Sequence, residues 1–172
     1  IEAMEAAVSN VIREVRALRT RASPEALFRS FASLGGERGW LVWNWAWALR
    51  GFLDRLLGGP GLRRGRRHPT ELLPGEAVDF WRVEAVEPPR LLRLRAEMRL
   101  PGRAWLEWEA REAEGGSLLV QTAYFEPKGL TGFLYWWALY PIHRRIFSDL
   151  ARAIVREAEA QAEAPPRGGG AG

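Results

Sequence analysis

Two neighbouring stretches of the sequence alternate between apolar and charged side chains, and this pattern constrains the fold more than any other feature. Residues 92–100 (LRLRAEMRL) and residues 104–111 (AWLEWEAR) both follow it. Successive side chains of a strand point to opposite faces, so each stretch predicts a strand with one apolar and one charged face. The chain is therefore expected to contain an antiparallel sheet whose apolar face is covered by another layer.

Turn signals extend these two strands into a meander of four strands between residues 77 and 126. Pro and Gly mark the turns at 87–89, 101–102 and 114–116. Residues 12–21 predict a further, edge-like strand. The strands near 78–86 and 117–126 are apolar on both sides, so the sequence leaves their inward faces open.

The charged faces of the meander carry acids that could serve as paired acid and base groups. Glu97, Glu107 and Glu109 each lie beside arginines on the same predicted faces. Cross-strand pairs of opposite charge are the ordinary reason for such a pattern, so we expect ion pairs there. Asp79 lies on a strand without a clear charged face, and its role stays open.

Two helices are predicted between the first strand and the meander. Ser23-Pro24-Glu25 combines a capping hydroxyl, a proline at the first helical position and an acid in the first turn, and Gly35-Gly36 is the expected end. An apolar stripe predicts a second helix over 46–57. The tryptophan-rich segment 40–47 (WLVWNWAW) fits strand and helix spacing equally well.

One long helix is predicted from Thr131 to about Gln161, with Pro141 expected to kink or break it. Its apolar stripe consists of Leu139, Ile142, Ile146, Leu150 and Ile154. A helix with one such stripe must pack on the apolar face of the sheet, which predicts an α+β fold.

Composition excludes several kinds of chemistry. The chain has no cysteine, which rules out disulfides, thiolate metal ligands and a cysteine nucleophile, and a cytoplasmic location is the expectation. The two histidines, His68 and His143, form no ligand spacing, so we expect neither a metal nor a cofactor. The apolar stretches are too short or too interrupted to span a bilayer. We expect a leading helix or linker remnant at 1–11, one domain at 12–161 and a disordered tail at 162–172.

Three longer segments carry a family resemblance: GWLVWNWAWALRGFLDRLLGGPGLRRGRRHP, GEAVDFWRVEAVEPPRLLRLRAEMRLPGRAWLEWE and LLVQTAYFEPKGLTGFLYWWALYPIHRRIF. They resemble a family of uncharacterised domains that follow the NAD(P)-binding domain of epimerase-like short-chain dehydrogenase proteins, within the START-like helix-grip (SRPBCC) superfamily. The resemblance implies a curved antiparallel sheet wrapped around the long C-terminal helix, two short helices after the first strand, and a cavity between sheet and helix. It also implies a possible upstream or separate NAD(P)-binding partner. The sequence itself has no GxGxxG fingerprint, and the family supplies no catalytic residues to carry over.

Aromatic and neutral polar side chains in apolar surroundings are the mixture that binds organic ligands. On this basis the predicted ligand-binding residues are Trp43, Trp45, Trp81, Met98, Trp108, Gln121, Tyr124, Trp136, Tyr140 and His143. Each of them is also an ordinary core residue for a domain of this size. Arg63, Arg64, Arg66 and Arg67 form the densest basic run, for which a solvated surface loop is the ordinary explanation. Binding of an anionic membrane is the alternative, and nucleic acid is not the expected partner.

The leading functional prediction is binding of an apolar or amphipathic small molecule, such as a lipid, isoprenoid or aromatic metabolite, by a chain that is not an enzyme on its own. One alternative is a small enzyme in which His143, Asp79 or Tyr124 transfers protons, which requires these side chains to converge in one pocket. The other alternative is surface binding through the Arg63 to Arg67 loop.

Overall fold

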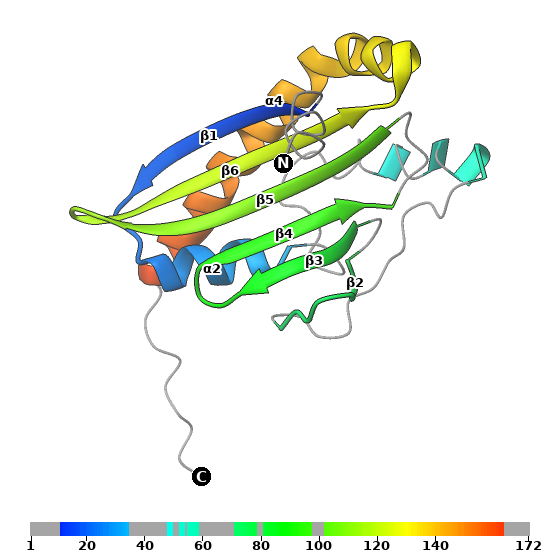
Figure 1. Cartoon of the computed structure of the whole chain (residues 1–172). Coiled ribbons are helices and arrows are strands. Elements are labelled where there is room, and N and C mark those ends of the chain that lie inside the picture. The colour runs from blue at the N-terminus through cyan, green and yellow to red at the C-terminus, as the bar shows by residue number, and fades with distance from the viewer. Residues whose placement is uncertain are drawn as a thin grey trace, which may run out of the picture.

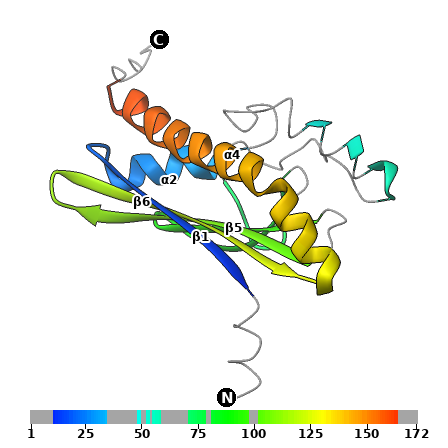
Figure 2. The ribbon, with the colours of Figure 1, turned by 90° about the horizontal axis from the view of Figure 1, so that it is seen from above.

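The computed structural model describes residues 11–34, 48–49, 52–53, 55–58, 71–78, 81–97 and 102–163. Six strands in this part of the chain form one antiparallel sheet in the order β1-β6-β5-β4-β3-β2. Their bounds are β1 Ile12–Thr20, β2 Ala77–Val78, β3 Trp81–Glu87, β4 Leu91–Ala96, β5 Gly102–Ala113 and β6 Gly116–Pro127. Two helices, α2 (Pro24–Ala32) and α4 (Gly129–Glu163), lie together on one side of the sheet (Figures 1 and 2).

The first strand and first helix agree with the sequence signals. β1 lies at the edge of the sheet and pairs only with β6 among the described strands. Ser23 caps α2, with its hydroxyl oxygen 3.2 Å from the backbone nitrogen of Ala26, which donates the hydrogen bond. The helix ends at Ala32, ahead of the expected glycines, and Gly35-Gly36 lie outside the described residues.

The meander has one hairpin more than the sequence predicted. The strand expected over 78–86 is divided into β2 and β3, which pair antiparallel with Val78 opposite Trp81. A turn is recognised in sequence where it interrupts the alternation of apolar and polar residues. This stretch is apolar on both faces and has no such alternation, so the sequence did not reveal the reversal. Asp79 lies outside the described residues.

The inner face of the sheet, which α2 and α4 cover, carries the predicted apolar positions. Leu92 and Leu94 of β4, and Leu106 and Trp108 of β5, are all 1% exposed or less. The register resolves the two strands that the sequence left open. Trp81 pairs with Ala96 and therefore lies on the inner face, as do Gln121 and the residues at alternate positions of β6.

The long helix α4 is continuous through Pro141 and does not break there. Its second half packs on α2 and the sheet, where Leu150 and Ile154 are fully buried and the Ser30 hydroxyl donates to the Ile154 carbonyl oxygen at 2.8 Å. Ile142 is 54% exposed, so its predicted place in the buried stripe is wrong. The buried stripe keeps the predicted Ile146 and includes Trp136, because the contact face is set by where the helix crosses β6 and β1.

Residues 48, 49, 52, 53, 55 and 56 are helical, which agrees with the second predicted helix as far as it is described. The tryptophan-rich segment 40–47 lies outside the described residues. No helix within the described ranges is both long and apolar enough to cross a membrane.

Candidate functional site

A row of polar side chains crosses the inner face of the sheet beneath α4. Arg16 of β1, Gln121 of β6 and Trp108 of β5 are direct neighbours across three strands. The Trp108 indole Nε1 donates to Gln121 Oε1 at 2.8 Å, and Gln121 Nε2 donates to the carbonyl oxygen of Phe147 in α4 at 2.9 Å. The row thus connects the sheet to the helix through hydrogen bonds in the layer between them.

An ion pair on β1 adjoins this row. Arg16 Nη2 lies 2.6 Å from Glu14 Oε1 and also donates to the carbonyl oxygen of Arg144 in α4 at 3.2 Å. The side chains of Arg16 and Glu14 are only 24% and 16% exposed. Arg16 Nε and Glu14 Oε2 are buried and have no hydrogen-bond partner within the described chain. One donor and one acceptor are therefore left under the helix, where each unsatisfied group costs about 1–3 kcal/mol.

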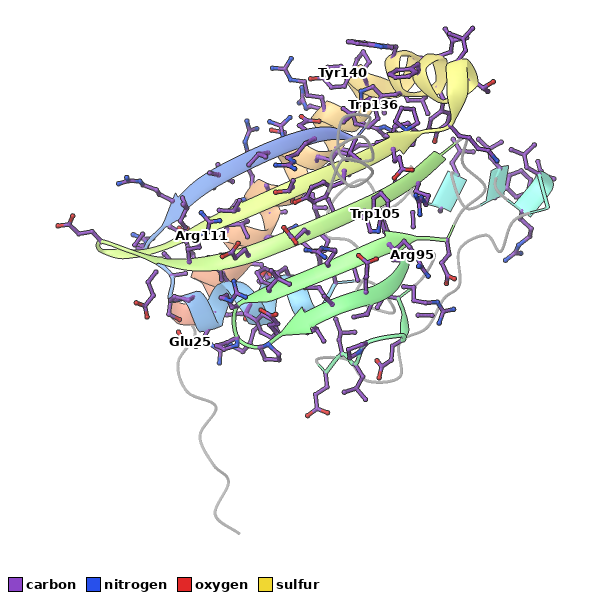
Figure 3. All side chains as sticks on the ribbon, in the orientation of Figure 1. Glu25, Arg95, Trp105, Arg111, Trp136 and Tyr140 are labelled. Atoms are coloured by element: carbon purple, nitrogen blue, oxygen red, sulfur yellow. The ribbon has the colours of Figure 1, made fainter. Side chains whose placement is uncertain are left out.

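Aromatic side chains of α4 continue the layer next to the ion pair. Trp136, 5% exposed, stacks on Phe125 of β6 with ring centroids 5.3 Å apart. Tyr140 and His143 follow at helical spacing, with ring centroids 5.8 and 6.1 Å from that of Trp136. Figure 3 labels Trp136 and Tyr140 on the first half of the helix.

The ion pair lies beneath this aromatic part of the helix. Phe125 is opposite Ile12 in the β-sheet, so Trp136 lies over the start of β1. The helix reaches Arg16 at Arg144. Tyr140 and His143 fall between these two points along the helix, and Glu14 falls between Ile12 and Arg16 on the inner face of β1.

The opposite, outer face of the sheet carries the charged network that the alternation predicted. Arg93 bonds Glu107 across strands at 2.6 and 2.9 Å, and Arg82 lies 2.9 Å from Glu97. Glu109 contacts Arg111 at 3.1 Å, and this hydrogen bond lowers the pKa of the Glu109 carboxyl below its ordinary value. The predicted ion pairs of Glu97, Glu107 and Glu109 are thus confirmed. Figure 3 shows Arg95, Trp105 and Arg111 on these strands.

Tyr124 belongs to this outer face, which corrects its predicted place in a cavity between sheet and helix. It is opposite Trp105 in the register, and its hydroxyl donates to Glu107 Oε2 at 3.4 Å. Burial raises the pKa of the Tyr124 phenol, and the Glu107 carboxylate adds to the increase. Because His143 packs beneath α4 while Tyr124 lies on the other side of the sheet, these two candidate proton-transfer groups do not converge.

The fold brings the remaining described candidates to one face but gives them different surroundings. Trp136, Tyr140 and His143 line the underside of α4, whereas Trp81 and Trp108 are core residues, 4% and 0% exposed. Trp43, Trp45, Met98 and the basic loop Arg63, Arg64, Arg66 and Arg67 lie outside the described residues. None of these placements tests ligand binding, which stays a prediction.

The sequence interpretation missed Glu14 and Arg16. Their signal was present in the strand Ile12 to Thr20, where period two puts Glu14, Arg16 and Leu18 on the same side. The charged residues on both faces of that strand concealed it. The described residues contain no cluster of three or more histidine, aspartate or glutamate side chains arranged to hold a metal.

An antiparallel sheet wrapped against a long C-terminal helix, with a short helix after the first strand, is the START-like (Bet v1-like) helix-grip fold. Residues 9–150 match the model of the family described as "Protein of unknown function (DUF2867)", and the chain belongs to this family. No curated protein matches the sequence significantly.

Solved structures share the fold at low sequence identity. Ara h 8.0201 is 12% identical with a TM-score of 0.54, and the match covers 87% of this chain and 99% of that one. A norcoclaurine synthase of Thalictrum flavum, solved with a transition-state analogue, is 13% identical with a TM-score of 0.52, covering 89% and 97%. The di-domain ARO/CYC StfQ of the steffimycin biosynthetic pathway is 13% identical with a TM-score of 0.55, covering 95% of this chain and 55% of that one. These likenesses concern the fold alone.

Proposed function

We propose that this chain binds an amphipathic small molecule between the inner face of the sheet and the first half of α4. The observation that carries the proposal is the half-satisfied ion pair of Glu14 and Arg16. Its free atoms, Glu14 Oε2 and Arg16 Nε, are buried without a hydrogen-bond partner in the described chain. Buried polar atoms in native proteins are nearly always satisfied, so a pair of orphans next to an aromatic wall favours a ligand or an ordered water there.

The two free atoms define the chemistry of the polar end of such a ligand. Glu14 Oε2 accepts a hydrogen bond and Arg16 Nε donates one. A hydroxyl group can satisfy both, because it donates and accepts at once. The neighbouring rings of Trp136, Tyr140 and His143 suit an apolar or aromatic body. A lipid, isoprenoid or aromatic metabolite with a hydroxyl end combines these features.

The norcoclaurine synthase supports the proposal, because that protein of the same fold was solved in complex with a small molecule, a transition-state analogue. Catalysis is not part of the proposed function, since His143 and Tyr124 are separated by the sheet. An accessory role beside an NAD(P)-binding partner, and a cytoplasmic location, stay predictions from the sequence.

The test begins with native mass spectrometry of the purified protein, followed by extraction and identification of any co-purifying molecule. Binding of a panel of long-chain alcohols and the matching alkanes is then compared by shifts in melting temperature. Arg16→Met and Glu14→Gln are expected to reduce the shift given by the alcohols more than that given by the alkanes. Arg19→Met is the matched control, because Arg19 lies on the same strand and points away from the helix.

The proposal fails if the protein is repeatedly empty and no member of the panel shifts its melting temperature. Equal loss of binding in Arg16→Met and Arg19→Met would also contradict it, because only Arg16 adjoins the inner layer.

A further inference from the structure

The first half of α4 is apolar on its solvent side as well as its inner side. Leu130, Leu134 and Trp137 are 75%, 62% and 67% exposed, although the same turns bury Trp136 against the sheet. Phe133 and Ile142 extend this exposed stripe. The spacing i, i+3, i+4 and i+7 places Leu130, Phe133, Leu134 and Trp137 along one side of the helix. A helix that is apolar all round is ordinarily covered on all sides.

A second group of exposed apolar side chains lies at the same end of the molecule. It consists of Leu49, Phe52, Leu53, Leu56 and Leu57, which are 45–68% exposed. Figures 1 and 2 show the described helical parts of residues 48–56 and the start of α4 at one end of the fold, away from α2. Apart from Val15 and Leu73, all exposed large apolar side chains of the described ranges belong to these two groups. We call the two groups together the apolar end.

The charged residues that flank the α4 part of the apolar end are basic. The sequence has no acid between Glu126 and Asp149, while Lys128 and Arg144 flank the stripe. Both basic residues belong to the exposed surface. The first half of α4, with leucine and aromatic residues beside basic ones and no acids, has the composition of segments that lie in the interface of an anionic bilayer.

A second copy of the chain fits this surface less well. An isologous interface would bring the basic residues of one copy against those of the other. Anionic lipid headgroups instead neutralise these charges while the acyl boundary covers the apolar side chains.

We propose that the apolar end docks on an anionic membrane surface, with Leu130, Leu134 and Trp137 inserted at the boundary between headgroups and acyl chains. Lys128 and Arg144 contact the lipid phosphates. The helix lies on the membrane and does not span it. This docking concerns the solvent side of α4 and is independent of ligand binding on the inner side.

The first experiment is flotation of the whole protein with vesicles of phosphatidylcholine alone or with roughly 30% phosphatidylglycerol. The double variant Leu134→Ser with Trp137→Ser is compared with the control Val15→Ser with Leu73→Ser, which removes exposed apolar side chains elsewhere. We expect the first to bind anionic vesicles about tenfold or more weakly than the wild type, and the control to bind like the wild type. All four positions are exposed, so circular dichroism is expected to be unchanged.

The second experiment uses the absence of native cysteine. Leu134→Cys and Val15→Cys are each labelled with an environment-sensitive nitrobenzoxadiazole dye. Anionic vesicles are expected to shift the emission of the dye to shorter wavelength at position 134 and not at position 15. Added salt is expected to weaken binding, since the attraction to headgroups is screened.

Four results would overturn the proposal. The first is no flotation with the anionic vesicles at low salt. The second is equal binding by the two double variants. The third is equal binding to vesicles with and without phosphatidylglycerol. The fourth is concentration-dependent self-association that Leu134→Ser with Trp137→Ser abolishes while vesicles bind no protein, which would assign the surface to a second copy.

Discussion

Replacement of Gln121 by leucine tests the connection between the sheet and the long helix. Gln121 is 2% exposed and holds two buried partners, the Trp108 indole nitrogen at 2.8 Å and the Phe147 carbonyl oxygen at 2.9 Å. Leucine has nearly the same volume but can make neither hydrogen bond. The expected loss in the free energy of unfolding is about 2–4 kcal/mol, from two net hydrogen bonds of about 1 kcal/mol each and an orphaned indole N–H.

A double-mutant cycle separates the cost of the orphaned indole N–H from that of the lost hydrogen bonds. Trp108→Phe removes the indole donor, so Gln121→Leu in that background leaves no buried N–H without an acceptor. The two substitutions should therefore be non-additive by about 1–2 kcal/mol, with the double variant more stable than the sum predicts.

The assay is equilibrium unfolding in urea, followed by circular dichroism so that the loss of a tryptophan does not change the signal. A loss of this size corresponds to a fall in melting temperature of about 4–16 °C for a domain of 150 residues or more. A Gln121→Leu variant within about 0.5 kcal/mol of the wild type, or strictly additive effects, would refute the hydrogen-bonded connection.

Two further predictions concern the turn before β6 and the outer face. A Cβ at Gly116 would collide with the Thr20 carbonyl oxygen, whereas a Cβ at Gly115 would meet open space. Gly116→Ala should therefore lower the melting temperature well beyond the effect of Gly115→Ala. The cost of Gly115→Ala, about 1–2 kcal/mol, comes from the positive φ of Gly115 alone. Equal effects in thermal unfolding would contradict this reasoning. The pKa of the Tyr124 phenol is raised in the folded protein, so folding favours its neutral form. This contribution to stability is fully present below about pH 10 and is lost as the pH rises through the pKa of the folded state. Above about pH 10 the wild type should therefore lose stability relative to Tyr124→Phe. Absorbance titration near 295 nm measures the same group, and a difference between wild type and Tyr124→Phe centred at or below pH 10 would contradict the burial beside Glu107.

Local patterns were sufficient for much of the fold. The alternation at 92–97 and 104–111 identified the inner and outer faces of β4 and β5, because side-chain direction in a strand depends only on position along it. The Ser23 cap was equally predictable, since a cap is made by residues within one turn. The outer ion pairs followed from the same alternation.

The sequence alone also determined the chemistry that is excluded. The absence of cysteine removes thiol chemistry whatever the fold.

Only the tertiary structure decided which side chains meet under the long helix. The face of β6 was ambiguous in sequence because Gln121 and Tyr124 both lie in apolar surroundings, and the pairing with β5 placed them on opposite sides. The contact of Arg16 with the Arg144 carbonyl oxygen is set by the crossing of α4 over β1, more than a hundred residues away in sequence. Periodicity within a strand carries no information about that crossing, because it depends on how separate elements pack together.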